Sequence, residues 1–133
     1  MRLGMATIGT VVLLACASGH VTGMRLENVP TGDWGGPHAQ LSVSERGATI
    51  EFDCGHGTLD EPLALNQEGR FDVSGRFARE GGPVHEGDTG QPVRYSGKTD
   101  GHELTLEIVF EKGERSGPYE LGLGRSSRLF KCK

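Results

Sequence analysis

The stretch Leu104-Thr105-Leu106-Glu107-Ile108-Val109-Phe110 decides the fold that this sequence predicts. Every second residue in it is large and apolar, a period of two that is typical of a strand with one buried face. Asp100-Gly101 stands just before it and favours a tight hairpin turn. Val93 and Tyr95 alternate in the same way on the far side of that turn. The stretch is therefore predicted to be one arm of an antiparallel hairpin.

Short alternating runs of the same kind recur along the chain. Turn residues separate them, and no run is long and periodic enough for a helix. The expected strands lie at residues 34–43, 48–54, 59–65, 71–77, 93–95, 104–110, 119–123 and 128–132. Strands in sequential hairpin order favour an up-and-down meander, and closing the meander removes its two exposed edges. We predict an all-β domain over residues 32–133, with about eight antiparallel strands closed or nearly closed into a small barrel.

Residues 1–15 have the features of a secretory signal. Arg2 precedes an apolar run from Leu3 to Leu14, which is too short to span a bilayer. Leu13-Leu14-Ala15-Cys16 resembles the lipobox of bacterial lipoproteins, in which the cysteine receives a diacylglyceryl group and cleavage falls just before it. Ala15-Cys16-Ala17 also fits ordinary signal-peptidase cleavage before Ser18. The first interpretation predicts a lipid anchor at Cys16, and the second predicts a secreted or periplasmic protein.

The residues after Cys16 bear on where an anchored protein would lie. Ala17 is not the aspartate that retains lipoproteins at the inner membrane of diderm bacteria, so an outer-membrane location is expected if the host is diderm. Residues 16–31 are polar and weakly patterned, and we predict that they form a flexible tether. The expected partner of this segment is the membrane, through the lipid.

The cysteine count supports lipidation. The chain has three cysteines, an odd number that leaves one thiol unpaired in an exported protein. Lipidation of Cys16 leaves Cys54 and Cys132 as a pair in an oxidising compartment, and their spacing is unlike that of metal-binding cysteines. A disulfide between them is therefore predicted, and closing so long a loop contributes about 4 kcal/mol in the chain-entropy model.

Composition narrows the class of partner. The net charge of −4 is modest and spread along the chain, which gives no reason to expect a nucleic-acid partner. The 22 glycines are scattered without a repeat, as expected for many tight turns between short strands. No cofactor is expected.

Gly32-Asp33-Trp34 at the start of the first strand resembles a motif of the calycin superfamily, which contains lipocalin-like and avidin-like barrels. The meander and the basic residue in the last strand are similar too. The resemblance implies that Trp34 closes one end of the barrel, that Arg128, or otherwise Arg125, packs over it, and that a ligand binds in the lumen. Separately, the layout of residues 31–38 and 52–57 resembles a group of secreted bacterial proteins with no known activity.

The barrel hypothesis also relates the two cysteines in space. Cys54 is expected to end the second strand and Cys132 the last, each on the apolar face. Both then reach the same end of the barrel, where a disulfide would staple its closure.

Candidate catalytic chemistry is sparse. His56 lies beside Asp53 and Cys54 in the sequence, and the first hairpin would allow His38 to approach them, which leaves a histidine-based metal or binding site open. A disulfide-bonded Cys54 cannot be a ligand. No Ser/His/Asp order or pair of catalytic carboxylates stands out, so an enzyme is not favoured. His85 and His102 are expected to be solvated.

We expect a lipid-anchored cell-envelope protein with a non-catalytic barrel that binds a small molecule or a protein, with the loop from Arg79 to Pro92 as one candidate surface. The residues expected inside the barrel are bulky: Ile50, Phe52, Leu59, Leu63, Phe71, Phe77, Tyr95, Leu106, Ile108, Phe110, Tyr119 and Leu121. Such residues can fill a small barrel. A structural envelope module with a packed interior is therefore the main alternative, and the histidine-based metal site is the other.

Overall fold

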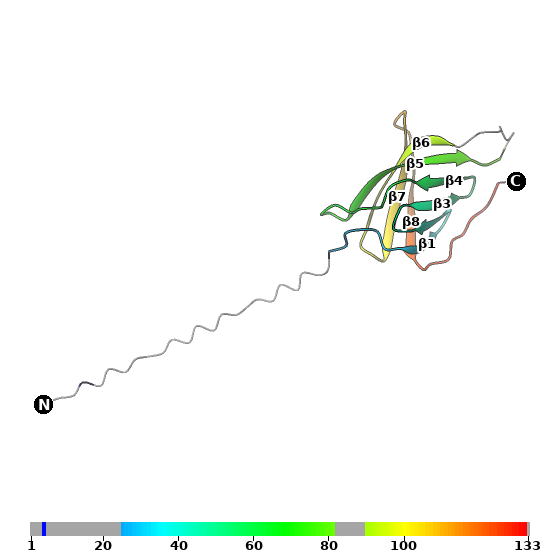
Figure 1. Ribbon diagram of the computed structural model, residues 1–133. Coiled ribbons are helices and arrows are strands. Elements are labelled where there is room, and N and C mark those ends of the chain that lie inside the picture. Colours follow the sequence, from blue (N-terminus) through cyan, green and yellow to red (C-terminus); the bar gives the residue numbers. More distant parts are fainter. Residues whose placement is uncertain (1–3, 5–24, 82–89, 133) are drawn as a thin grey trace.

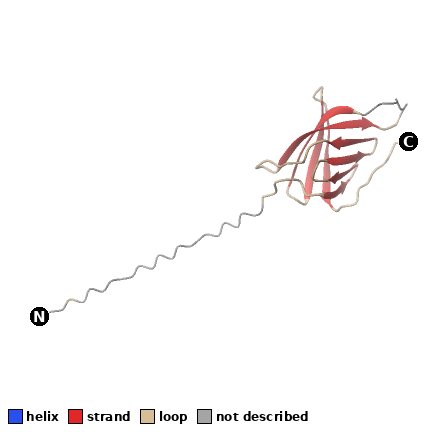
Figure 2. Ribbon diagram, viewed as in Figure 1, coloured by secondary structure: helices blue, strands red, loops and turns tan. Residues whose placement is uncertain are grey.

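The computed structural model describes residue 4 and residues 25–81 and 90–132. Within these residues the chain forms eight strands and no helix (Figure 2). The strands are β1 (Gly32–Gly36), β2 (Ala39–Val43), β3 (Ala48–Phe52), β4 (Gly55–Leu59), β5 (Arg70–Arg79), β6 (Gln91–Thr99), β7 (Glu103–Phe110) and β8 (Arg115–Leu123). None of the described residues belongs to a helix that could span a membrane.

The strands form a closed antiparallel barrel in simple meander order (Figure 1). Each strand pairs with the next in sequence, and β1 pairs with β8 to close the ring. The predicted all-β meander barrel is confirmed. So is the hairpin at Asp100-Gly101, where Thr99 pairs with Leu104 across the turn and Gly101 has a φ of 103° that favours glycine.

The barrel has two distinct ends. The turns at 44–47, 60–69 and 100–102 lie at one end, which we call the Trp34 end. The turns at 37–38, 53–54 and 111–114 lie at the other, together with the residue that follows β5. This second end carries both disulfide cysteines and is called the disulfide end. The C-terminus and the end of β5 both lie on the right in Figure 1.

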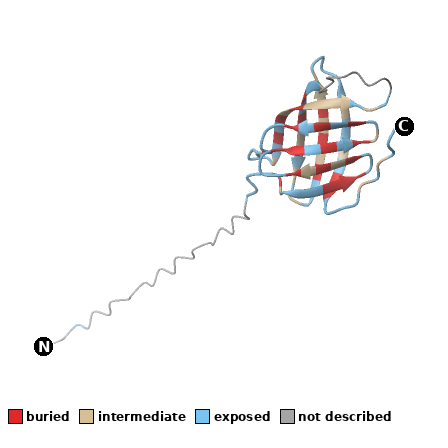
Figure 3. Cartoon of the chain, turned by 45° about the vertical axis from the view of Figure 1, so that its right-hand side comes forward, coloured by how far each residue is buried: buried red, intermediate tan, exposed pale blue. Residues whose placement is uncertain are grey.

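Side chains fill the middle of the barrel. Alternate residues of β2, β3 and β4 are buried, which contributes to the banded pattern in Figure 3. Tyr95 is fully buried, and its hydroxyl donates a 2.7 Å hydrogen bond to the Arg76 carbonyl. Gly57 and Gly75 face the same ring, and a Cβ on either would collide with it. Because these glycines of β4 and β5 have no side chains, the large ring from β6 fills the space in front of them.

The Trp34 end is closed by irregular segments. The Val29 amide donates to the Leu63 carbonyl at 2.9 Å, and both side chains are buried. The indole N–H of Trp34, which is fully buried, donates to the Pro30 carbonyl at 3.0 Å. Residues 27–30, assigned to the tether from sequence, therefore pack on the barrel, because Val29 supplies an apolar side chain to this end. The expected strand at 59–65 is also wrong, since β4 ends at Leu59 and Leu63 belongs to no strand.

The C-terminal residues differ from prediction. β8 ends at Leu123, and residues 124–132, called the C-terminal segment, are not a strand. An isolated bridge joins Arg128 to Pro37. The expected last strand at 128–132 was wrong, because β8 already occupies the free edge of β1 over Trp34 and Gly35.

We expect Trp34→Phe to lower the free energy of unfolding by about 1–3 kcal/mol, because it leaves the Pro30 carbonyl without its donor and opens a void. Urea unfolding followed by far-ultraviolet circular dichroism measures this. Leu123→Ala is the control, an exposed residue of the closing strand that should change stability by less than about 0.5 kcal/mol. Equal stability of Trp34→Phe and wild type would show that Trp34 does not hold this end.

Candidate functional site

The predicted disulfide is present at the disulfide end. Cys54 and Cys132 are bonded, with a Cα–Cα distance of 5.1 Å and a sequence separation of 78 residues. Their positions differ from the expected ones. Cys54 lies in the turn after β3, the third strand, and Cys132 lies in the C-terminal segment; both residues are exposed. The bond therefore fastens the C-terminal segment to a turn and does not join two strands.

Backbone hydrogen bonds hold the same segment along the barrel. The His38 amide donates to the Arg128 carbonyl at 2.8 Å, and the Arg128 amide donates to the Gly36 carbonyl at 3.1 Å. Further on, the Cys132 amide donates to the Asp53 carbonyl at 3.1 Å. The C-terminal segment thus forms part of the wall at the disulfide end.

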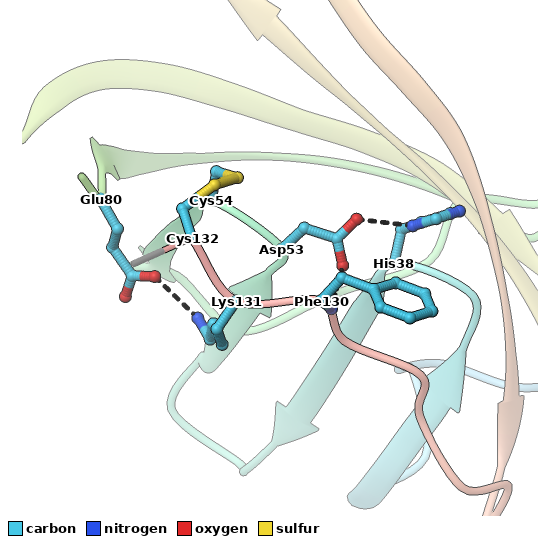
Figure 4. The surroundings of a disulfide bond; sticks show 7 residues. All are labelled: His38, Asp53, Cys54, Glu80, Phe130, Lys131 and Cys132. Carbon is cyan, nitrogen blue, oxygen red and sulfur yellow. Dashed lines mark hydrogen bonds and ion pairs between the residues drawn. A yellow bond between two sulfur atoms is a disulfide. The ribbon is translucent and has the colours of Figure 1, made fainter.

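Asp53 is the polar centre of this wall (Figure 4). One carboxylate oxygen accepts the Phe130 amide at 2.8 Å, and the other lies 2.6 Å from His38 Nδ1. The pKa of the Asp53 carboxyl is below its ordinary value, chiefly because of the Phe130 hydrogen bond. Partial burial opposes this shift, and His38 and Lys131 add smaller lowering contributions. Asp53 is therefore a carboxylate with two fixed partners.

A second polar group lies beside the disulfide. Lys131 Nζ donates to Glu51 at 2.6 Å and to Glu80 at 2.9 Å, and Glu80 also lies 2.9 Å from His56 Nδ1. Desolvation lowers the pKa of Lys131, but the two carboxylates outweigh it and raise that pKa. The hydrogen bond from Lys131 is the main reason why the pKa of Glu80 is lowered. The charges in this group are paired with one another.

His38 has an unusual backbone conformation. It and Pro37 link β1 to β2, with a φ of 70° at His38. In a type II turn, proline is common at the first of the two central positions, and the second position requires a positive φ. Glycine or asparagine usually occupies that second position. The ring is held by Asp53 and lies 6.1 Å from the Phe130 ring, centroid to centroid. Strained residues held by specific contacts are often part of functional sites.

The two candidate histidines do not form a joint site. His38 pairs with Asp53, whereas His56 lies on the exposed face of β4 and pairs with Glu80. Among the described residues there is no group of three or more His, Cys, Asp or Glu side chains that could hold a metal ion. The metal alternative gains no support. His102 is exposed in the turn before β7, and His85 lies outside the described residues.

The expected barrel-closing pair is also apart. The indole of Trp34 reaches Pro30 at the Trp34 end, whereas Arg128 is exposed and bonds through its backbone at the far end of β1. Arg125 lies nearer the closure, where its guanidinium contacts Gly122 and pairs with Glu103 at 2.6 Å. The buried position of Trp34 agrees with a plug, but Arg128 does not lie where a cover would.

A cavity opens at the disulfide end, and we call it the mouth. Its volume is about 440 Å³, within the range of small-molecule sites. Its lining residues are His38, Phe52, Asp53, Cys54, Gly55, Phe77, Arg79, Glu80, Tyr119 and Cys132.

The floor of the mouth is aromatic. Phe52 contacts Tyr119 and Phe77, with ring centroids 4.9 and 5.8 Å apart, and Phe77 meets Phe110 at 5.7 Å. Phe52 is buried, and the other three rings are partly exposed. We call these four rings the aromatic layer. Three of these rings, Phe52, Phe77 and Tyr119, line the mouth, and Phe110 packs against Phe77.

Several residues of the mouth were not singled out from sequence. Tyr119, Phe77 and Phe52 were expected inside the barrel, but not as the floor of an opening. Arg79 and Glu80 lie at the start of the loop that the sequence predicts from Arg79 to Pro92. The alternation along β5 could have identified Arg79, because it continues the inward positions of Phe71 to Phe77.

No protein-family model, curated protein or solved structure matches this chain.

We expect Asp53→Asn to destabilise the protein near neutral pH and to matter less in acid. Because the folded-state pKa is lowered, this carboxylate contributes stability that is present above its unfolded-state pKa. The contribution is lost as pH falls through the folded-state pKa. Unfolding free energies of wild type and variant, measured between about pH 7 and pH 2, should therefore converge in acid.

Asp72→Asn is the control. Asp72 pairs with Arg94 on the exposed outer face, where such pairs contribute about 0–1 kcal/mol. A deficit of Asp53→Asn that stays constant down to about pH 2 would mean that the negative charge does not hold the C-terminal segment.

Proposed function

We propose that this chain is an exported, lipid-anchored cell-envelope protein whose barrel is a non-catalytic binding module for a small molecule. The observation that carries the binding proposal is the mouth, a cavity of about 440 Å³ with an aromatic floor and a polar rim. Aromatic rings with partly exposed faces gain free energy when an apolar ligand covers them. A few polar groups at the rim would orient such a ligand.

The lipid anchor is supported by the cysteines. Cys54 and Cys132 are joined, so Cys16 is the third cysteine in the sequence and has neither of them as a partner. It follows the lipobox-like residues 13–15 and lies outside the described residues. An exposed disulfide agrees with an oxidising compartment, although secretion without a lipid would provide one as well.

The position of the N-terminal residues fits an anchored binding module. Residues 27–30 pack at the Trp34 end, whereas the mouth opens at the opposite end. A chain anchored through residues before 25 would therefore enter the barrel at the end away from the mouth. In such an arrangement the membrane does not cover the site, and an outer-membrane location in a diderm host remains our expectation.

Catalysis is the weaker proposal. The His38–Asp53 pair has the geometry of an oriented base, but both cysteines that line the mouth are in a disulfide and cannot act as nucleophiles. Binding needs only the cavity and the aromatic layer. Recognition of a protein through residues 79–92 is a separate hypothesis. Most of that segment, residues 82–89, lies outside the described residues.

A structural module with a packed interior is the second candidate function. The filled core favours it, since Trp34, Tyr95 and Leu106 are fully buried. The two proposals differ at the mouth, because a purely structural barrel has no need to bind a ligand there.

The anchor is tested by the intact mass of the protein from the membrane fraction of its own host, with and without reductant. We expect a chain that begins at Cys16 and carries acyl groups, and a gain of two hydrogens on reduction of the Cys54–Cys132 bond. Cys16→Ser should abolish the acylated species, and it should still gain two hydrogens when the disulfide is reduced. A soluble species that begins at Ser18 would contradict the anchor.

The mouth is tested with naphthylethanol, a neutral aromatic probe, by isothermal titration calorimetry. We expect wild type to bind it and Tyr119→Ser to bind it at least about tenfold more weakly, because the variant removes one ring of the aromatic layer. Leu123→Ser, an exposed residue of the same strand near the Trp34 end, should leave binding unchanged. Wild-type protein that does not bind the probe would favour the structural module.

A further inference from the structure

The mouth contains a cation in an unusual position. Arg79 is the last residue of β5 and continues the inward alternation of that strand, beyond Phe77. It pairs in register with Gly55, a buried inward position of β4, and it lines the cavity. Its side chain is therefore presented to the cavity from the inner face of the barrel, next to the aromatic layer.

The guanidinium of Arg79 has no hydrogen bond or ion pair with any described residue. The other basic side chains nearby are engaged, since Lys131 bridges Glu51 and Glu80, and His38 pairs with Asp53. A guanidinium has five N–H donors in a planar fork that matches a carboxylate. Within the described part of the chain, Arg79 thus offers an unused, anion-binding group at the rim of an aromatic pocket.

The carboxylates of the mouth do not cancel the attraction of Arg79 for an anion. Asp53 accepts hydrogen bonds from the Phe130 amide and lies against His38, and Glu80 is held by Lys131 and lies against His56. Each negative charge is thus offset by donors of its own within the wall. Of the charged groups described at the mouth, Arg79 is the one left over for a ligand.

We infer that the mouth takes an amphipathic carboxylate, whose apolar body lies on the aromatic layer and whose carboxylate pairs with Arg79. The inference rests on the proposed binding function and adds the chemical class of the ligand. The cavity of about 440 Å³ accommodates a molecule with one or two fused rings or a short branched chain, and it limits the ligand to small molecules.

The test compares two probes that differ in charge, naphthylacetate and naphthylethanol, by isothermal titration calorimetry. We expect wild type to bind the acid about tenfold more tightly than the alcohol, with the difference shrinking as salt is added. Arg79→Gln keeps a polar side chain without the charge and should abolish the difference between the two probes. Arg79→Lys should retain part of it.

Arg46→Gln is the matched control, because Arg46 is exposed in the turn between β2 and β3 at the Trp34 end. It should retain the full preference for the acid. Equal binding of the two probes by wild type, or an acid preference that survives in Arg79→Gln, would overturn the role of Arg79 and leave the binding module standing. Failure of wild type to bind either probe would overturn both.

Discussion

The pairing of β1 with β8 is the constraint on which the rest of the structure depends. This closure consists of two register pairs, Trp34 with Leu123 and Gly35 with Gly122, whereas β1 and β2 share five. The two glycines leave the outer face of the seam without side chains. The C-terminal segment uses that space, since a Cβ on Gly35 would collide with the Arg125 carbonyl. A short seam is thereby covered by a second layer of chain.

The same segment continues to the disulfide end and becomes part of the wall of the mouth. After the seam, Ser127 donates to Gln40 at 2.7 Å, and the Arg128 backbone then pairs with Gly36 and His38. The segment ends at the Cys54–Cys132 bond, which closes a loop long enough to contribute about 4 kcal/mol in the chain-entropy model. The C-terminal segment therefore contributes both to the closure of the barrel and to the wall of the mouth. A change in this segment should affect both.

The division between a filled interior and an open mouth arises from where glycine and aromatic residues face each other. Gly57 and Gly75 admit the ring of Tyr95 to the centre, where burial raises the pKa of its hydroxyl. Near the disulfide end, Gly55 similarly faces Phe77. Beyond that ring, β5 supplies a charged residue, Arg79, in place of another apolar one. The inner face of one strand thus changes from core to rim within two residues.

The sequence by itself determined the fold class and the disulfide partners. Alternation with a period of two, as in residues 104–110, and turn pairs such as Asp100-Gly101 act locally, so they could be interpreted without knowing what lies across the barrel. The inward residues of β5 to β7 were predicted from the same alternation. Lipidation of Cys16 remains a prediction, because it lies outside the described residues.

Only the tertiary structure decided how the C-terminal segment runs and what the mouth contains. Local alternation at Arg128, Phe130 and Cys132 predicts a strand, but a strand also needs a free edge, and β8 had already taken that of β1. Phe130, which donates to Asp53, and Lys131, which donates to Glu80, lie 77 and 51 positions away in the sequence. No local pattern specifies which distant donor a carboxylate will meet. Contacts of that kind arise only when the ring has closed.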